Sequence, residues 1–214
     1  MKAITTKLTT RAACGLLVIA QVIATHIANA ALNSIDLVPG TGDGLITRDT
    51  ASGLDWLDHT RTLGLSFNDV SSRLGVGGEF QGFHFATLSE VNTLYTNAGL
   101  PADRLFTPSL YEPALSFITL VGGTVNSPSN AFVTGIINLK FGDSYQTKGV
   151  SARLQFGELM GSTGTSCCES PDQPIPTISS WLARPVPEPT TCALLGLGGL
   201  VIVCYVARRR RGSH

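Results

Sequence analysis

Three side chains that can bind metals or transfer protons lie close together around the first tryptophan. Asp55, Asp58 and His59 fall within five residues, and two carboxylates with an imidazole could hold a divalent cation. On a helix this spacing would put them on one face, but the surrounding residues are typical of a strand, in which Asp55 points away from Asp58. We therefore interpret the group as a polar edge after a hairpin and expect no metal site and no cofactor.

Other candidates for catalysis are isolated in the sequence. His84 stands between Phe83 and Phe85, an alternation that places it on the solvent face of a short strand. The chain has no nucleophile elbow of the G-x-S-x-G type and no P-loop. Residues 41–44 contain only a fragment of a calcium loop, because the spaced acids and the distal glutamate of an EF-hand are missing. We expect no catalytic residue and a protein that is not an enzyme.

Two tryptophans and one cysteine pair are the other side chains with special chemistry. Trp56 and Trp181 could stack on sugars, but we expect them to pack in the core, as large aromatic side chains in strands usually do. Cys167 and Cys168 are adjacent, so a disulfide between them would close no loop and add little stability. Three alternatives stay open for the pair: a redox-sensitive turn, an intermolecular disulfide, or two thiols in a disordered loop.

The first half of the chain predicts a hairpin followed by two helices. The composition of residues 45–57 is typical of two short strands joined by a turn. Capping boxes then begin at Ser66 and Thr87, each with an acidic residue three positions later, and apolar residues follow at helical spacing. Residues 83–86 predict a short strand that leads directly into the second helix.

The second half of the chain is richer in β-forming residues. Strands are predicted for residues 131–139, 149–156 and 179–183. Prolines indicate irregular chain at 101–113, and residues 157–176 indicate a long loop because Gly, Ser, Thr and Pro are frequent there. Residues 114–121 fit a buried helix or a buried strand, and their periodicity does not decide between the two. Together these elements predict an α+β fold: one small domain with two helices and a mostly antiparallel sheet.

The N-terminal segment has the composition of a secretory signal peptide. Its positive n-region contains three basic residues: Lys2, Lys7 and Arg11. An apolar stretch follows, and Ala28 and Ala30 form an A-x-A site for signal peptidase. We expect cleavage after Ala30, which assigns residues 1–30 to the signal peptide and residues 31–184 to the exported domain. An uncleaved signal anchor is the alternative.

The C-terminal segment combines three features in a fixed order. A tripeptide comes first: Pro187, Glu188 and Pro189. An apolar run follows, of 15 residues at 192–206 or of 18 residues if it is counted over 190–207. Its helical length of about 22 to 27 Å is slightly short of a ~30 Å hydrocarbon core. Four arginines come next: Arg208, Arg209, Arg210 and Arg211. The prolines keep the tripeptide extended and accessible, and the arginines favour a cytoplasmic C-terminus with the domain outside.

This order resembles the tail of PEP-CTERM proteins. Within residues 185–214, the sorting motif would lie at 187–189, a transmembrane helix at about 190–207, and a basic stop-transfer cluster at 208–211. The resemblance implies a Gram-negative bacterium that makes exopolysaccharide, transient anchoring in the inner membrane, and cleavage near the tripeptide by an exosortase. The protein would then lie at the cell surface or outside the cell. A permanent membrane anchor is the alternative, although a plain anchor needs no proline pair at its outer edge.

The charge balance of the chain depends on these end segments. The whole chain has 15 basic and 15 acidic residues, whereas residues 31–186 have eight basic and 14 acidic residues, a net charge of −6. A domain without a basic stripe lacks the electrostatic basis for binding nucleic acid. An acidic surface suits solubility outside the cell.

Three segments of the domain resemble a recurrent group of exported PEP-CTERM cargo proteins. They read ASGLDWLD at 51–58, GFHFATLSEV at 82–91 and SWLAR at 180–184. They are also similar to bacterial domains with "TGL-W" and "WRLPT-EL" motifs and a C-type-lectin-like fold, although the second segment lacks the Trp, Arg and Pro of its motif. The resemblance implies that the last strand returns beside the first, and it implies no catalytic residue.

These patterns lead to two functional hypotheses. The first is an exported, non-enzymatic cell-surface or extracellular-matrix protein that exosortase sorts and that is linked to exopolysaccharide or biofilm. The alternative is a carbohydrate-binding, lectin-like module, with or without Ca²⁺. An enzyme would need a pocket in which a histidine lies beside a carboxylate with a matched pKa.

Overall fold

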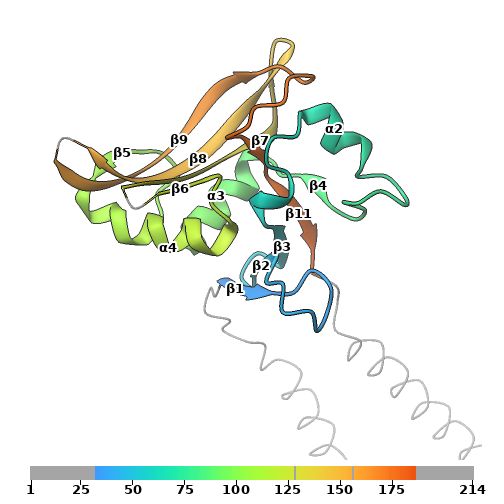
Figure 1. Cartoon of the computed structure of the whole chain (residues 1–214), viewed down its shortest axis with the longest axis horizontal. Coiled ribbons are helices and arrows are strands. Elements are labelled where there is room, and N and C mark those ends of the chain that lie inside the picture. Colours follow the sequence, from blue (N-terminus) through green and yellow to red (C-terminus); the bar gives the residue numbers. More distant parts are fainter. Residues whose placement is uncertain (1–31, 128, 156, 187–214) are drawn as a thin grey trace, which may run out of the picture.

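The first sheet is built from short strands around the predicted hairpin. The computed structural model describes residues 32–127, 129–155 and 157–186 (Figure 1). Five strands pair antiparallel in the spatial order β1 (Leu32–Ile35), β2 (Ile46–Asp49), β3 (Leu54–Leu57), β11 (Leu182–Pro185) and β4 (His84–Phe85). The hairpin predicted for residues 45–57 is confirmed as β2 and β3, and the strand predicted at 83–86 is β4.

The second sheet contains the long strands. Its spatial order is β10 (Ser179–Ser180), β7 (Asn130–Phe141), β8 (Ser144–Gln155), β9 (Glu158–Glu169) and β5 (Arg104–Thr107), and β6 (Val125–Ser127) also pairs with β7. Among the strands that the structure describes, only β10 and β7 pair in parallel. The expected α+β fold with mostly antiparallel strands is confirmed, but the strands form two sheets.

The prediction of a long loop at residues 157–176 is wrong for residues 158–169 and holds for residues 170–176, which lie in no helix or strand. β9 occupies residues 158–169 and pairs with β8 from one end to the other, with one shift of register. Packing requires at least one of its small residues, because a Cβ at Gly161 would overlap the backbone carbonyl of Leu110. The composition indicates a loop. The segment nevertheless forms a strand, because β8 offers backbone hydrogen-bonding groups with which it can pair.

The prediction of irregular chain at residues 101–113 is also wrong. The stretch contains β5, the 3₁₀ helix η2 (Pro108–Leu110) and the first turn of α4 (Tyr111–Val121). Pro108 begins η2, and Pro113 is the third residue of α4. Proline is tolerated at these positions because the N–H groups in the first turn of a helix have no partner within the helix. Residues 114–121 therefore belong to a helix, the third α-helix of the described chain.

The two predicted helices are confirmed together with their caps. They are α2 (Phe67–Ser72) and α3 (Leu88–Asn97), and both capping boxes form, at Ser66 and at Thr87. A 3₁₀ helix, η1 (His59–Arg61), precedes α2. α4 packs against β7, β8 and β9, and α3 contacts β7, so these two helices cover the same face of the second sheet (Figure 1).

Two buried tryptophans pack against each other where the two sheets meet. Trp56 in β3 and Trp181 between β10 and β11 are each 1% exposed, and their rings meet edge to face with centroids 5.9 Å apart. The N–H of Trp181 donates to the carbonyl of Ile136 in β7, and its carbonyl accepts from Ala86 after β4. The expectation that both tryptophans pack in the core is confirmed. The predicted last strand at 179–183 is divided between the sheets at Trp181, and β11 returns beside β3 instead of β1.

Candidate functional site

The described chain ends one residue after β11, a strand of the first sheet. β11 lies between β3 and β4, and its last residue, Pro185, is opposite Leu54 at the start of β3. The N–H of Val186 donates to the carbonyl of Gly53 at 2.9 Å. Because the next residue is Pro187, the predicted sorting tripeptide follows this hydrogen bond without any linker.

A buried carboxylate fixes β11 beside the hairpin. Asp55 of β3 is fully buried, and its two oxygens accept hydrogen bonds from Arg48 at 2.7 and 3.0 Å. Arg184 of β11 lies 3.5 Å from the same carboxylate, with its guanidinium over the ring of Phe83. The hydrogen bond from Arg48 to Asp55 raises the pKa of Arg48 above its usual value. Two arginines on strands flanking β3 therefore share one carboxylate, immediately before the tail.

The turn between β2 and β3 is fixed by Asp49. Its buried carboxylate accepts from the N–H groups of Ala51 and Ser52 at 3.0 and 3.2 Å, and from the Ser52 hydroxyl at 2.7 Å. The side-chain amide of Asn97, at the end of α3, donates to Asp49 at 2.7 Å. Gly53 closes the turn with φ of 69°, a conformation that glycine adopts without steric cost. The chain therefore leaves the domain beside a turn with little freedom to move.

The residues predicted for sorting and processing lie outside the described residues. They are Pro187, Glu188, Pro189, Arg208, Arg209, Arg210, Arg211, Ala28 and Ala30. The predicted transmembrane segment at 190–207 lies there too, and no helix between residues 32 and 186 with described placement is long and apolar enough to cross a membrane.

The cysteine pair has a described backbone only. Cys167 and Cys168 lie in β9 where its register with β8 shifts, between the pairs Thr147–Ser166 and Tyr145–Glu169. Their side chains are outside the described part of the chain. The backbone is therefore a strand with an irregularity, and not the turn or loop that the sequence indicated.

The interpretation of His59 as part of a polar edge is wrong. His59 begins η1, is fully buried, and packs edge to face on Trp181 with centroids 4.0 Å apart. Burial lowers the pKa of His59 to about 3, so the imidazole is neutral at physiological pH. Its Nδ1 forms a short hydrogen bond with the hydroxyl of Ser179.

The three clustered side chains of the sequence do not form one site. Asp55 is bound by arginines, and Asp58 instead caps η1 by accepting from the N–H of Thr60 at 2.9 Å. His59 lies in the core. Among the residues that the structure describes, no group of three or more His, Cys, Asp or Glu side chains could hold a metal ion.

The contact between His59 and Ser179 pairs the groups that serine hydrolases use. Both residues are fully buried, and the Ser179 hydroxyl also lies 3.0 Å from the carbonyl of Thr134, to which it can donate. A substrate cannot reach a hydroxyl that solvent does not reach. The pair therefore links η1 to β10 and β7 as part of the core.

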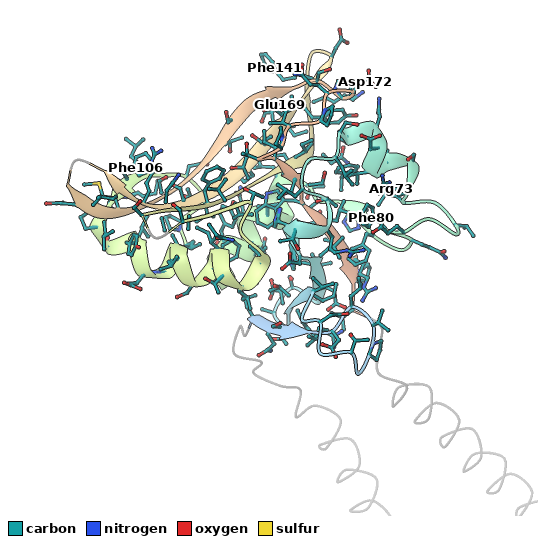
Figure 2. All side chains as sticks on the ribbon, in the orientation of Figure 1. Arg73, Phe80, Phe106, Phe141, Glu169 and Asp172 are labelled. Atoms are coloured by element: carbon teal, nitrogen blue, oxygen red, sulfur yellow. The ribbon has the colours of Figure 1, made fainter. Side chains whose placement is uncertain are left out.

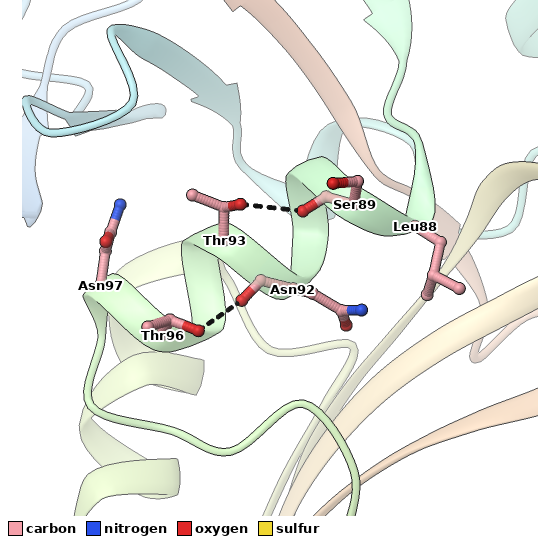
Figure 3. A pocket seen from close by; sticks show the side chains of 6 residues that line it. All are labelled: Leu88, Ser89, Asn92, Thr93, Thr96 and Asn97. Carbon is pink, nitrogen blue, oxygen red and sulfur yellow. Dashed lines mark hydrogen bonds between the residues drawn. The ribbon is translucent and has the colours of Figure 1, made fainter.

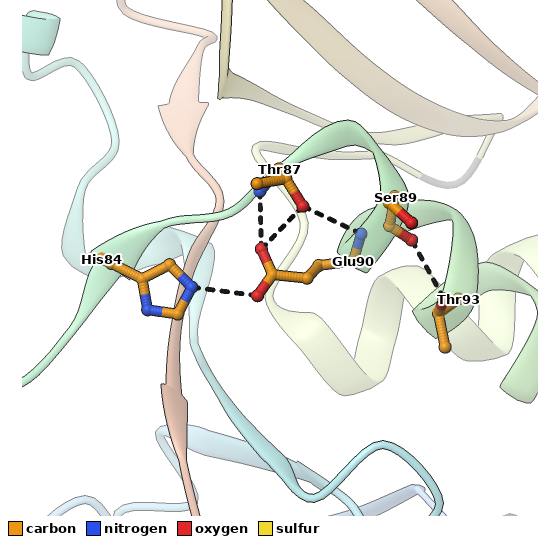
Figure 4. A network of polar contacts seen from close by, with 5 residues as sticks. All are labelled: His84, Thr87, Ser89, Glu90 and Thr93. Carbon is orange, nitrogen blue, oxygen red and sulfur yellow. Dashed lines mark hydrogen bonds and ion pairs between the residues drawn. The ribbon is translucent and has the colours of Figure 1, made fainter.

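His84 and Glu90 form a second histidine–carboxylate pair, at the surface. The side chain of His84 is 44% exposed, as predicted, and its Nε2 lies 3.1 Å from Glu90 (Figure 4). The other oxygen of Glu90 accepts from the N–H and hydroxyl of Thr87 at 2.7 and 2.9 Å. Burial opposes ionisation of Glu90, but the hydrogen bonds from Thr87 and His84 lower its pKa below the usual value. A carboxylate so engaged is a weak general base, and we interpret the pair as the N-terminal cap of α3.

The fragment of a calcium loop uses its carboxylates internally. Asp43 accepts hydrogen bonds from the N–H of Leu45, the hydroxyl of Thr41 and the N–H of Leu37, which lower its pKa to about 2. Asp36 in the same way accepts the N–H groups of three glycines of the loop. Both carboxylates therefore accept hydrogen bonds from backbone N–H groups and fix the conformation of the loop between β1 and β2.

Comparison with known families identifies the tail. Residues 185–211 match the model of the PEP-CTERM protein-sorting motif. The chain carries a PEP-CTERM sorting motif. The match begins inside the described structure, at the end of β11, and continues through the tripeptide, the apolar segment and the arginines. The chain matches no curated protein and no solved structure at a significant level.

The PEP-CTERM motif implies an exported protein that exosortase sorts and that is anchored transiently through its C-terminal end. The segment to which the comparison gives a function is therefore the tail, which begins at the end of β11. The sequence predicts the tail from the order of its features. It does not predict the contacts of Arg184 with Asp55 and of Val186 with Gly53, because these depend on pairing between strands that are about 130 residues apart in the chain.

A hollow of about 560 Å³ lies over the exposed side of α3 (Figure 3). Its lining is uncharged and consists of Leu88, Ser89, Asn92, Thr93, Thr96 and Asn97. The hydroxyls of Thr93 and Thr96 donate to backbone carbonyls one turn earlier, at 3.0 and 2.9 Å. None of these side chains is an acid, a base or a strong nucleophile, so this hollow does not supply acid–base chemistry.

The face of the second sheet opposite α4 carries aromatic and hydroxyl groups. Phe132, Ser151 and Ser162 lie in one row across β7, β8 and β9, and the two serine hydroxyls are 2.8 Å apart. The guanidinium of Arg153 lies 4.1 Å from the ring centroid of Phe106, which projects on the side away from α4 (Figure 2). These five residues line a hollow of about 190 Å³ together with their neighbours. We name this set the open sheet face; its side chains are of the kinds that stack on sugars and hydrogen-bond to them.

Proposed function

We propose that the chain is a non-enzymatic, exported cell-surface or extracellular-matrix protein linked to exopolysaccharide or biofilm. The observation that carries the proposal is the PEP-CTERM motif, which begins at the last strand of a small folded domain. Both histidine pairs of the described domain, His59 with Ser179 and His84 with Glu90, have a role in the fold: His59 packs in the core and Glu90 caps α3. This supports a structural or adhesive role.

The proposal includes a route of export. Signal peptidase removes residues 1–30 after Ala30, and the segment at 190–207 holds the chain in the inner membrane. The arginines at 208–211 keep the C-terminus in the cytoplasm, so the domain at 31–184 and the tripeptide lie outside, where an exosortase cleaves. The protein then stays at the cell surface or leaves the cell.

Intact mass and cell fractionation of the native protein test this route. The expected protein lacks residues 1–30 and the tail, and it is found outside the inner membrane. Replacing Pro187, Glu188 and Pro189 by alanines should retain the tail and hold the protein in the inner membrane. The control is the pair Pro174→Ala and Pro176→Ala, which changes two prolines outside the motif and should leave processing unaltered. A tail that persists in the unaltered protein would refute the route.

Carbohydrate binding is the second candidate function. The open sheet face favours it, because Phe106 and Phe132 offer aromatic rings beside the hydroxyls of Ser151 and Ser162. Under this proposal the domain is a lectin-like module, with a C-type-lectin-like arrangement as its finer form, that binds exopolysaccharide through this face, with or without Ca²⁺.

Binding of the mature protein to the producer's own polysaccharide tests the second candidate. Phe106→Ala should weaken binding about tenfold, a loss of about 1.4 kcal/mol, because it removes the ring on which Arg153 lies. Phe141→Ala is the matched control, since Phe141 is an exposed phenylalanine at the far end of β7 (Figure 2). A chelator distinguishes the calcium-dependent form. Absence of binding would exclude this candidate and leave the sorting route untouched.

A further inference from the structure

The two ends of the described domain lie in one row of the first sheet. Leu32, the first residue of β1, is opposite Asp49; Asp49 is opposite Leu54; and Leu54 is opposite Pro185 at the end of β11. Four strands separated by three spacings of ~4.8 Å put these ends about 14 Å apart. The two segments that we expect to enter the membrane, the one before β1 and the one after β11, therefore leave the sheet at the same end of its strands. They lie on either side of the β2–β3 turn.

The distance between the domain and the sorting motif is limited by the chain. Val186 is held by Gly53, and each further residue adds at most 3.8 Å between Cα atoms. Glu188, two residues beyond Val186, can therefore lie no more than about 8 Å from it. An enzyme that binds the tripeptide must come equally close to the β2–β3 turn.

The β2–β3 turn, residues 50–53, suits close contact with another protein. Its side chains are small and uncharged: Thr50, Ala51, Ser52 and Gly53. The N–H groups of Ala51 and Ser52 donate to Asp49, which Asn97 holds in place by a further hydrogen bond. These bonds fix the shape of the turn before any partner arrives, so docking costs little conformational entropy. The charge nearest to it is the buried carboxylate of Asp49, which accepts hydrogen bonds from the turn itself. The charges of Arg48 and Arg184 are partly neutralised by Asp55.

We propose that the β2–β3 turn is the surface on which exosortase docks when it cleaves the tail. The length of chain between Val186 and the tripeptide forces the enzyme against this turn, and its rigidity makes the turn a defined part of the recognised surface. The inference rests on sorting by exosortase and adds a second recognition element, which lies in the folded domain and not in the motif.

A bulky substitution combined with a spacer tests the inference in the full chain. Ala51→Trp should slow removal of the tail about tenfold, which corresponds to about 1.4 kcal/mol in the barrier, because the indole separates the turn from the enzyme. Insertion of ten Gly and Ser residues between Val186 and Pro187 should restore the rate of Ala51→Trp to that of the spacer alone. Val76→Trp is the control, since Val76 is 97% exposed in the loop after α2 and should not change the rate.

The same experiment separates failure of the docking surface from failure of sorting. If the unaltered chain keeps its tail, sorting by exosortase fails. If the unaltered chain is processed and Ala51→Trp is processed equally fast, docking on the turn fails. If the spacer does not restore Ala51→Trp, the substitution acts through the fold and the inference is overturned. A photo-crosslinking amino acid at position 51 should link to exosortase, whereas a link to lipid or no link at all contradicts the choice of partner.

Discussion

The imidazole of His59 makes the stability of the domain depend on pH. Its pKa falls to about 3 in the folded state because of burial, whereas the unfolded chain binds a proton with a pKa near 6.5. Between these values the unfolded state carries more protons, so the free energy of unfolding falls as the pH falls below 6.5. At pH 5 we expect a loss of roughly 2 kcal/mol relative to pH 7.5, measured by denaturant unfolding.

The control for this prediction is the other histidine of the described domain. His59→Gln should remove most of the pH dependence between 5 and 7, while His84→Gln should retain it, because the buried imidazole is still present. Equal slopes for the native protein and His59→Gln would show that another group titrates in this range.

The close packing of His59 also explains why position 135 in β7 is a glycine. A Cβ at Gly135 would lie 2.8 Å from both the His59 ring and the Trp181 ring, so we expect Gly135→Ala to lower the free energy of unfolding by about 1–3 kcal/mol through overpacking. Gly164 in β9 is a matched glycine in the same sheet, and a Cβ there would meet no atom within 4 Å. Gly164→Ala should leave stability unchanged or raise it by ~0.5 kcal/mol, as urea unfolding would reveal. The prediction fails if both substitutions have the same effect.

Among the elements, β11 is the strand on which the first sheet depends, because it joins the hairpin to β4. Asp55→Asn leaves Arg48 and Arg184 without their shared counter-charge. Breaking a buried ion pair costs about 3–5 kcal/mol; since both arginines reach solvent, we expect about 2 kcal/mol, measured by thermal or urea unfolding.

Glu79 provides the matched control, since it pairs with Arg61 and Arg73 at distances of 2.6 and 3.1 Å but is exposed. Glu79→Gln should cost less than about 1 kcal/mol, because solvent screens exposed pairs. An equally small effect of Asp55→Asn would mean that the cluster does not hold β11 in place.

The elements that could be predicted from the sequence are those with local determinants. α2 and α3 follow from capping boxes that involve residues three positions apart, and the hairpin follows from a short turn. β9 and β5 have no such local pattern, because their conformation comes from pairing with each other and with β8. The local sequence places His59 at the surface for a related reason, since burial of a polar residue depends on distant partners such as Ser179. The tail was predictable because its order of features needs no tertiary context.

At the scale of the whole molecule, the arrangement of the chain ends follows from the register of four strands. The row from Leu32 to Pro185 places the ends about 14 Å apart, and this distance can be tested without any membrane enzyme. A circular permutant of residues 32–186 would join Val186 to Leu32 through six Gly and Ser residues, which can span up to ~25 Å. New ends would lie between Val76 and Gly77, in an exposed loop.

The permutant should unfold cooperatively, with a free energy of unfolding within about 2 kcal/mol of the linear domain, because exposed loops tolerate new ends and neighbouring ends tolerate joining. The control has a single glycine between Val186 and Leu32. Its two Cα steps reach only about 8 Å, so closure must pull β1 or β11 out of the sheet, and we expect a loss of several kcal/mol or no folding. If both linkers were equally stable, the ends would be closer than the register implies. If neither permutant folded, the ends would not meet at one edge, and an enzyme bound at the tail would have no reason to contact the β2–β3 turn.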